Sequence, residues 1–459
     1  MNPHPILPRP ASLSRRDFLA GGLTVGALLS ASHAGAGEPV PKPAGPHERL
    51  NLAFVGTQGR AWDDIMGCIQ ENPIALCDVD ERSLNRAAQQ LQANHGKARP
   101  VLYRDYREML DKEARHIDAL VVATSDHSHA PPAAVAMRLG KHVYCEKPLT
   151  HTVEEARLLA QLAAKHRVAT QMGTQIHAEG NYRRVVELIR AGAIGEVSEV
   201  YTWVSKGWAD GRFAAASPAP AHLDWDLWLG PARERPHSPG IHPANWRRFW
   251  EYGGGTLGDM GCHIIDVVFW ALGLSHCDAV WAEGPAPHPD GCPSGLRAHW
   301  HFPAGENAGR PRRDLTLHWS DSGNHPDILK ETVVNGRPLA TWGIGALFIG
   351  DRGKLVCDYG GLWLLPENEF KDFIRPQPSI PNSMGHHREW LHACRTGAPT
   401  TCHFGYSGPL TETVLLGNVA FRAGKRLTWD SAQLRCPGAP ETQALIAKEY
   451  RKGWDLVRS

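Results

Sequence analysis

Two aspartates and a histidine in a glycine-rich stretch, residues 253–266, have the spacing of an acid–base centre. Asp259 and His263 stand four residues apart, so on a helix they share one face. Asp266 follows about one turn later, and a carboxylate there can fix the tautomer of the histidine and suit it to act as a general base. The alternative for the same residues is a capping aspartate beside a packed histidine.

A lysine in another part of the chain offers the complementary charge. Lys147 follows a predicted strand over residues 141–145 and precedes Pro148. Oxidation of an alcohol needs a base for the hydroxyl proton and a cation for the developing alkoxide, and His263 with Lys147 would supply both. Taken alone, Lys147 is better explained as a solvated surface residue, so the chemistry depends on a cofactor beside it.

The elements that must position these groups begin with a dinucleotide-binding pattern. An apolar run over residues 50–55 leads through a glycine turn into a helical stretch, and the next apolar run ends at Asp78. Glycines let the backbone approach a pyrophosphate, and a helix N-terminus attracts it. Asp78 lies 22 residues after Gly56, where a carboxylate accepts from a ribose 2′-OH. NAD is therefore favoured, and Arg82 nearby leaves NADP open.

The glycine turn departs from the usual fingerprint, G-x-G-x-x-G. Gln58 and Ala61 stand where the pattern has its second and third glycines. Alanine is tolerated at the last position. Gln58 would crowd a pyrophosphate unless Gly59 takes over in a shifted turn.

The alternation of strand and helix continues to about residue 172 and predicts a doubly wound parallel sheet. Ligands bind such sheets at the carboxyl ends of the strands. The candidate cofactor-binding residues lie at these ends: Gly56, Gln58, Gly59, Arg60, Asp78, Thr124, Asp126, His129, Glu146 and Lys147. Asp126 is also expected to cap a helix. His127 and His129 make a poor ligand set without a thiolate partner, so no metal is expected.

Composition excludes several classes of protein. The 459 residues include 49 Lys and Arg against 48 Asp and Glu, which gives no general field for nucleic acid or an anionic membrane. Of 16 tryptophans, only Trp62 lies before residue 200, so the two halves of the chain have different tasks. Cysteine pairs 394–402 or 277–292 would be possible in an oxidising compartment.

The N-terminus has the pattern of an export signal. Arg15 and Arg16 precede a short apolar stretch and a small-residue exit around Ala34–Ala36, which is typical of twin-arginine signals. The mature protein is expected in the periplasm or outside the cell, with no membrane span. The expected organisation is a signal at 1–36, a linker at 37–48, a Rossmann domain at 49–172, a substrate and oligomerisation domain at 173–430 and a tail at 431–459.

Together, the glycine turn, Glu146-Lys147-Pro148 and the stretch from Gly255 to His263 resemble the Gfo/Idh/MocA oxidoreductases over about Leu50 to Tyr359. The resemblance implies an α/β fold: a Rossmann domain that binds a nicotinamide cofactor, and a C-terminal α/β domain with a large, open, mainly antiparallel sheet. It also implies a homo-oligomer. By resemblance, Lys147 orients the substrate hydroxyl, His263 is the general acid/base, and Asp259 positions substrate or His263.

The expected function is hydride transfer between a nicotinamide and a hydroxyl of a sugar, cyclitol or glycoside. Because no free nicotinamide pool exists outside the cytoplasm, a redox-neutral glycoside hydrolase or lyase with trapped NAD is an alternative. A non-catalytic sugar-binding protein is a third possibility, which Gln58 keeps open. The candidate substrate contacts lie at the domain junction and among the tryptophans: Gln175, His177, Trp246 and Arg247.

Overall fold

The computed structural model describes residues 48–455. The twin-arginine pattern and nearly all of the expected linker lie outside this range.

The first sheet is parallel throughout and confirms the predicted doubly wound domain. Its strand order is β3-β2-β1-β4-β5-β6, the order of a dinucleotide-binding fold. The strands are β1 (Asn51–Val55), β2 (Asn72–Cys77), β3 (Val101–Tyr103), β4 (Ala119–Val122), β5 (His142–Glu146) and β6 (Thr170–Gly173). Four of them are entirely or almost entirely buried residues, as expected for strands covered on both faces.

The helices of this half begin and end with recognisable caps. Asp80 accepts hydrogen bonds from two backbone amides at the start of α3, and Gly96 ends that helix in the left-handed region. Thr152 and Glu155 form a capping box at the start of α6. The helices are α2 (Arg60–Gly67), α3 (Glu81–His95), α4 (Tyr106–Glu113), α5 (Ala130–Arg138) and α6 (Val153–His166).

The second sheet is large and mainly antiparallel, as the sequence resemblance implied. Its order is β17-β16-β15-β7-β12-β9-β8-β18, and β7 with β12 is its parallel pair. The strands are β7 (Val197–Val204), β8 (Ala279–Glu283), β9 (Arg297–Phe302), β12 (Leu315–Asp321), β15 (Ile344–Gly350), β16 (Gly353–Cys357), β17 (Leu362–Leu365) and β18 (Leu427–Thr428).

Shorter elements fill the connections. The helices are α7 (Gly180–Arg190), α8 (Trp225–Leu229), α10 (Asp327–Glu331) and α13 (Gln443–Ile446), with single 3₁₀ turns at η2 (Ala114–His116), η3 (Asp126–Ser128), η4 (Gln175–Ala178), η5 (Asn245–Arg248), η6 (Leu339–Thr341) and η7 (Pro440–Thr442). Two small hairpins pair β10 (Gly305–Asn307) with β11 (Arg310–Arg312), and β13 (Val333–Val334) with β14 (Arg337–Pro338).

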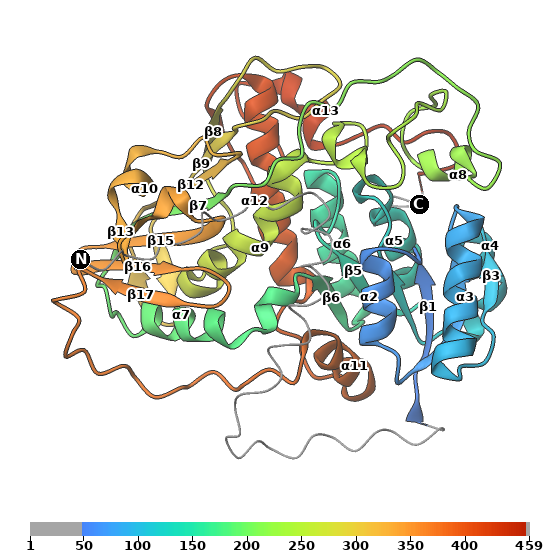
Figure 1. Ribbon diagram of the computed structural model, residues 1–459, viewed down its shortest axis with the longest axis horizontal. Coiled ribbons are helices and arrows are strands. Elements are labelled where there is room, and N and C mark those ends of the chain that lie inside the picture. Colours follow the sequence, from blue (N-terminus) through green and yellow to red (C-terminus); the bar gives the residue numbers. More distant parts are fainter. Residues whose placement is uncertain (1–47, 456–459) are drawn as a thin grey trace, which may run out of the picture. The chain divides into compact units, whose positions relative to one another are not determined.

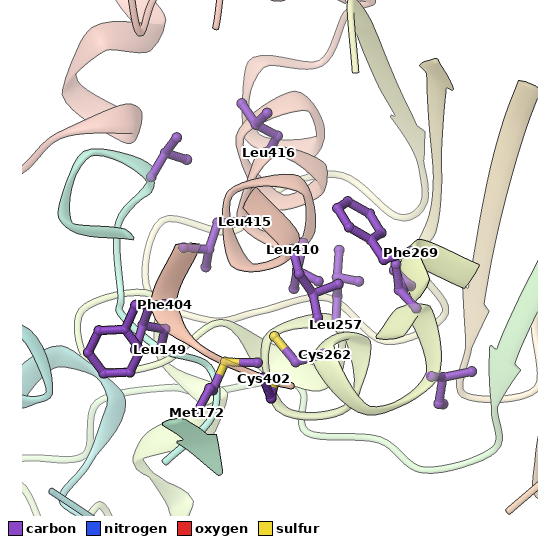
Figure 2. Packing of buried hydrophobic residues seen from close by; sticks show 14 of the residues in the cluster. Leu149, Met172, Leu257, Cys262, Phe269, Cys402, Phe404, Leu410, Leu415 and Leu416 are labelled. Atoms are coloured by element: carbon purple, nitrogen blue, oxygen red, sulfur yellow. The ribbon is translucent and has the colours of Figure 1, made fainter. Parts of the chain in front are cut away.

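Two long helices, α9 (Gly255–Leu272) and α12 (Phe404–Ala423), lie between the sheets (Figure 1). α12 packs against α6 of the first half and against β8 and β9 of the second. Figure 2 shows side chains of α9 and α12, among them Leu257 and Leu410, turned toward one another. Because a single buried cluster includes residues of both sheets, the halves share one core and hold the groups between them in fixed positions.

Part of the chain beyond residue 380 returns to the first half. α11 (His386–Thr396) places Trp390, which is fully buried, in a cluster with Leu52 and Phe54 of β1. Its ring lies 5.6 Å from that of Tyr144 on β5. The second half of the sequence therefore supplies a helix that packs on the Rossmann sheet. A domain boundary at residue 172 assigns this helix to the other domain.

No helix within residues 48–455 is long and apolar enough to cross a membrane. All ten cysteines are free thiols, so neither of the two cysteine pairs considered from the sequence forms here.

Replacing Trp390 with alanine is expected to lower the free energy of unfolding by about 3–5 kcal/mol, because a large buried ring is lost from the core. Urea unfolding followed by circular dichroism measures the change. Ile374→Ala, at a side chain that is 91% exposed, is the control and should have no effect. An unchanged midpoint for Trp390→Ala would contradict the packing of α11 on the first sheet.

Candidate functional site

The turn between β1 and α2 is shaped to admit a ligand. Gly56 has φ +97°, and a Cβ there would lie 2.4 Å from the carbonyl oxygen of Ala123, so any side chain would be blocked. Gly59 has φ +59° and stands directly before the first residue of α2, with nothing within 4 Å of a Cβ position. The second glycine of the turn is thus Gly59 instead of residue 58. Gln58 therefore does not need the positive φ that glycine adopts easily.

Asp78, at the end of β2, completes this turn. One carboxylate oxygen accepts from the backbone N–H and the hydroxyl of Thr57 at 3.0 and 2.7 Å, and the other accepts from the backbone N–H of Asp80 at 2.9 Å. Burial raises the pKa of Asp78. The oxygen that accepts only from Asp80 keeps a lone pair that can accept from a ribose hydroxyl, so the residues present fit an adenosine nucleotide.

A cavity of about 400 Å³ opens at these strand ends. The first half contributes the Gly56–Arg60 turn, Asp78, Thr124 and Ser125, which are among the predicted cofactor residues or adjacent to them. The second half contributes side chains that cover it: Leu227, Trp228, His242, Pro243, Trp246, Arg247 and Trp454. The cavity is therefore a crevice closed on one side by segments far away in the sequence.

Trp454 lies in the segment that the sequence analysis treated as a tail. Its ring is 5% exposed and packs against Tyr106 and the guanidinium of Arg107, whose Cζ lies 4.0 Å from the ring centre. The ion pairs Lys448–Glu155 and Arg451–Asp226 anchor the same segment to α6 and α8. In Figure 1 the segment runs from α13 past α8. Trp454 thus forms part of the wall of the nucleotide cavity.

Lys147 and Asp259 form a buried ion pair between the two halves. The Lys147 ammonium lies 2.7 Å from a carboxylate oxygen of Asp259 and donates to the Asp259 carbonyl oxygen at 2.8 Å. The two side chains are only 10% and 5% exposed. Lys147 thus has a buried partner, and the interpretation as a solvated surface lysine is wrong.

Asp259 holds further partners that the sequence did not reveal. Lys206 lies 2.7 Å from its second oxygen, the indole N–H of Trp208 donates to that oxygen at 2.8 Å, and Arg247 Nε lies 3.2 Å from the first oxygen. Burial alone would raise the pKa of Asp259, but Lys147, Arg247 and Lys206 outweigh it and hold that pKa well below its usual range. The carboxylate is ionised under all ordinary conditions.

The imidazole of His263 has a hydrogen-bond partner in Thr174, and not in Asp259 or Asp266 of its own helix. Its Nδ1 lies 3.2 Å from the hydroxyl oxygen of Thr174, which is also 3.4 Å from the Cys262 carbonyl. Where that hydroxyl donates to the carbonyl, Nδ1 donates to Thr174 and Nε2 keeps its lone pair. Burial and the Lys147 ammonium lower the pKa of His263 well below its usual range. The half-buried imidazole is neutral and can accept a proton.

Asp266 does not serve His263, and the expectation that it would is wrong. Both Asp266 oxygens lie 2.9 Å from Nδ1 of His177, and one accepts from the hydroxyl of Tyr406 at 2.7 Å. His177 is fully buried and stacks on Trp270 with ring centres 4.2 Å apart. The structure therefore places His177 in the core instead of at a position open to substrate. The side chains of His177, Asp266 and Cys402 lie close enough together that they could hold a metal ion.

Glu146 and Gln175 brace the strand ends. The amide of Gln175 donates to Glu146 at 2.6 Å and to the Tyr144 hydroxyl at 2.8 Å, and Arg60 donates to Glu146 at 3.3 Å. Burial and the nearby Asp64 carboxylate raise the pKa of Glu146 to about 7. Glu146 and Arg60 thus fix the end of β5 beside the glycine turn. They would support the cofactor site by holding these elements together.

The loop after β4 also differs from expectation. His129 is 1% exposed, and its two ring nitrogens face the carbonyls of Pro148 at 2.8 Å and Thr124 at 3.1 Å, so it ties this loop to the end of β5. Asp126 does not cap a helix: its two oxygens have no hydrogen-bond partner among the described residues. Burial raises its pKa to about 7. Trp246 is buried beneath the guanidinium of Arg247, with 4.1 Å from Cζ to the ring centre.

Comparison with known proteins accounts for this arrangement. Residues 50–174 match the model of an oxidoreductase family with an NAD-binding Rossmann fold, and residues 191–306 match its C-terminal α/β domain. The chain belongs to the Gfo/Idh/MocA family. Its first half is accordingly an NAD-binding Rossmann domain.

Individual relatives are distant. A glycosyl hydrolase family 109 protein from a Shewanella strain (MR-4) is 29% identical over 211 residues, 40% of this chain and 44% of that protein. The chain thus matches less than half the length of this curated relative. The crystal structure of GenD2 from gentamicin A biosynthesis, in complex with NAD, aligns over 86% of this chain and all of that one, with 19% identity and a TM-score of 0.56. Aldose–aldose oxidoreductase from Caulobacter crescentus aligns over 83% and 100%, with 17% identity and a TM-score of 0.53.

Replacing Trp454 with alanine is expected to weaken NADH binding about tenfold, since the aromatic wall of the cavity is lost. Fluorescence titration of the cofactor-free protein measures the dissociation constant. Trp281→Ala, on β8 and not among the cavity residues, is the matched control and should change nothing. Equal dissociation constants for Trp454→Ala and the unaltered protein would remove the C-terminus from the cofactor site.

Proposed function

We propose that the protein is an exported, NAD-dependent oxidoreductase that transfers hydride between the cofactor and a hydroxyl of a sugar, cyclitol or glycoside. The observation that carries the proposal is the buried Lys147–Asp259 pair at the end of β5, with a neutral His263 one turn further along α9. Arg247, which lines the nucleotide cavity, lies 3.2 Å from Asp259, and this supports a fixed cation and a proton acceptor near the cofactor.

The residues divide the work on the substrate hydroxyl. The Lys147 ammonium has three donors, of which two meet Asp259, so one is left for the substrate oxygen. It stabilises the negative charge that develops on that oxygen. His263 takes the hydroxyl proton in oxidation and returns it in reduction. A bound nicotinamide supplies the hydride acceptor or donor.

A second candidate is redox-neutral glycoside cleavage with NAD retained in the site. The family 109 glycosyl hydrolase relative favours it, and so does the physical problem of export, because a protein outside the cytoplasm has no free nicotinamide pool to draw on. The crevice closed by Trp454 is compatible with a retained cofactor. The third possibility, a sugar-binding protein without catalysis, has less support because Lys147, Asp259 and His263 are all in place.

Three features of the proposal each have a single line of support. Export depends on the twin-arginine pattern around Arg15 and Arg16, NAD over NADP depends on Asp78, and the homo-oligomer depends on the family resemblance. The substrate itself follows from chemistry: the site offers groups for one hydroxyl oxygen and aromatic faces that suit the C–H faces of a sugar ring.

Denaturing the purified mature protein and analysing the released small molecules by mass spectrometry tests the cofactor. The proposal predicts NAD, or binding of added NAD with reduction of it by a sugar or cyclitol. Cleavage of aryl glycosides without net NADH would select the hydrolase instead. A protein that neither contains nor binds a nicotinamide would exclude both.

Lys147→Met and His263→Asn are each expected to lower kcat/KM by at least about 100-fold, because one loses the cation and the other the proton acceptor. Bound cofactor, measured by near-ultraviolet absorbance, should be unchanged. Lys330→Met and His116→Asn, at side chains that are 59% and 52% exposed, are the controls. Activity that survives both site changes would show that the chemistry lies elsewhere.

A further inference from the structure

The Asp259 carboxylate has more cations around it than it can balance. Lys147, Lys206 and Arg247 all lie within 3.2 Å of its two oxygens. Among the described residues, none of the three has a second carboxylate within ion-pair distance. One negative charge therefore faces three positive charges, and the cluster carries a surplus of two.

Two other acids lie near this cluster: Glu146, which is paired with Arg60, and Asp126, which balances little of the surplus. Asp126 is 1% exposed and makes no hydrogen bond with the described residues. Its pKa, raised by burial to about 7, leaves it only partly ionised at neutral pH. A surplus of positive charge therefore remains at the cluster before any ligand enters.

Two of the three cations, Lys206 and Arg247, are more exposed to solvent than Lys147. Lys206 is 37% exposed and Arg247 is 23% exposed, against 10% for Lys147. Aromatic rings support both outer cations: Lys206 Nζ lies 5.2 Å from the ring centre of Trp208, and Arg247 lies over Trp246. These contacts hold the outer cations in place, so they present a fixed positive edge beside an aromatic face.

We infer that the substrate is a sugar with a carboxylate, whose acid group is held by Lys206 and Arg247 while a hydroxyl meets Lys147 and His263. The inference rests on the proposed function. A neutral sugar would leave the outer cations partly desolvated and without a counter-charge, which costs free energy. A carboxylate on the substrate would supply these two cations with the counter-charge that the protein does not provide.

Lys206 distinguishes this assignment from a role in cofactor binding. Arg247 lines the nucleotide cavity and could face a cofactor phosphate, but Lys206 is not among the cavity residues. An effect of Lys206 on the choice between acid and neutral sugar is therefore not explained by the loss of a contact in the nucleotide cavity.

The test uses the holoenzyme, loaded with NAD, and matched pairs of sugars that differ only in charge: D-glucuronate with D-glucuronamide, and D-galacturonate with D-galacturonamide. Calorimetry should show at least one acid binding about tenfold or more tighter than its amide, with the difference shrinking in about 0.5 M NaCl. Lys206→Met should remove most of the difference, and Lys330→Met should leave it intact.

Three results would overturn the inference: amides that bind as tightly as the acids, a preference that survives Lys206→Met, or tighter binding of glucose 6-phosphate than of either uronate. Failure of every uronate to bind also counts against it. Turnover of a neutral sugar in the same preparations would show that the proposed function stands while the acidic substrate does not. A protein without cofactor or sugar binding would instead remove the proposed function itself.

Discussion

The ion pair between Lys147 and Asp259 is the interaction on which the site depends. Lys147 comes from the end of β5 in the parallel sheet, and Asp259 comes from α9 between the sheets. A buried pair of this kind is held only if the surrounding packing fixes both partners, because breaking it would leave an uncompensated charge inside the protein. The shared core around α9 and α12 supplies that packing (Figure 2).

The two aspartates of α9 near His263 have different partners. Asp259 is ionised and holds cations, while Asp266 holds His177 in the core, so neither fixes the tautomer of His263. The hydroxyl of Thr174, the residue directly after β6, fills that role. A neutral partner leaves His263 uncharged beside Lys147, which is the state in which it can accept a proton.

Local periodicity predicted the parallel sheet, and the family resemblance implied the second sheet. Motifs of fixed spacing singled out Lys147, Asp259 and His263, which the structure brings together. The sequence did not predict Lys206, Trp208 or Trp454, which reach the site through tertiary contacts with no spacing to indicate them. A lysine two residues beyond β7 was the one available signal for Lys206. Asp266 was misjudged because helical spacing shows which residues share a face and not which partner lies opposite. His177 was misjudged because a position after the last strand of the parallel sheet does not show whether a side chain faces the site or the core.

The central claim is that Asp259 holds Lys147 in position for the substrate hydroxyl. The most direct measurement is the rate at which a sugar turned over by the enzyme reduces the bound nicotinamide in a single turnover, compared between the unaltered holoenzyme and Asp259→Asn. The account predicts a rate at least about 100-fold slower with cofactor content and circular dichroism unchanged. A folded, NAD-loaded Asp259→Asn enzyme that reduces its cofactor at the original rate would contradict it.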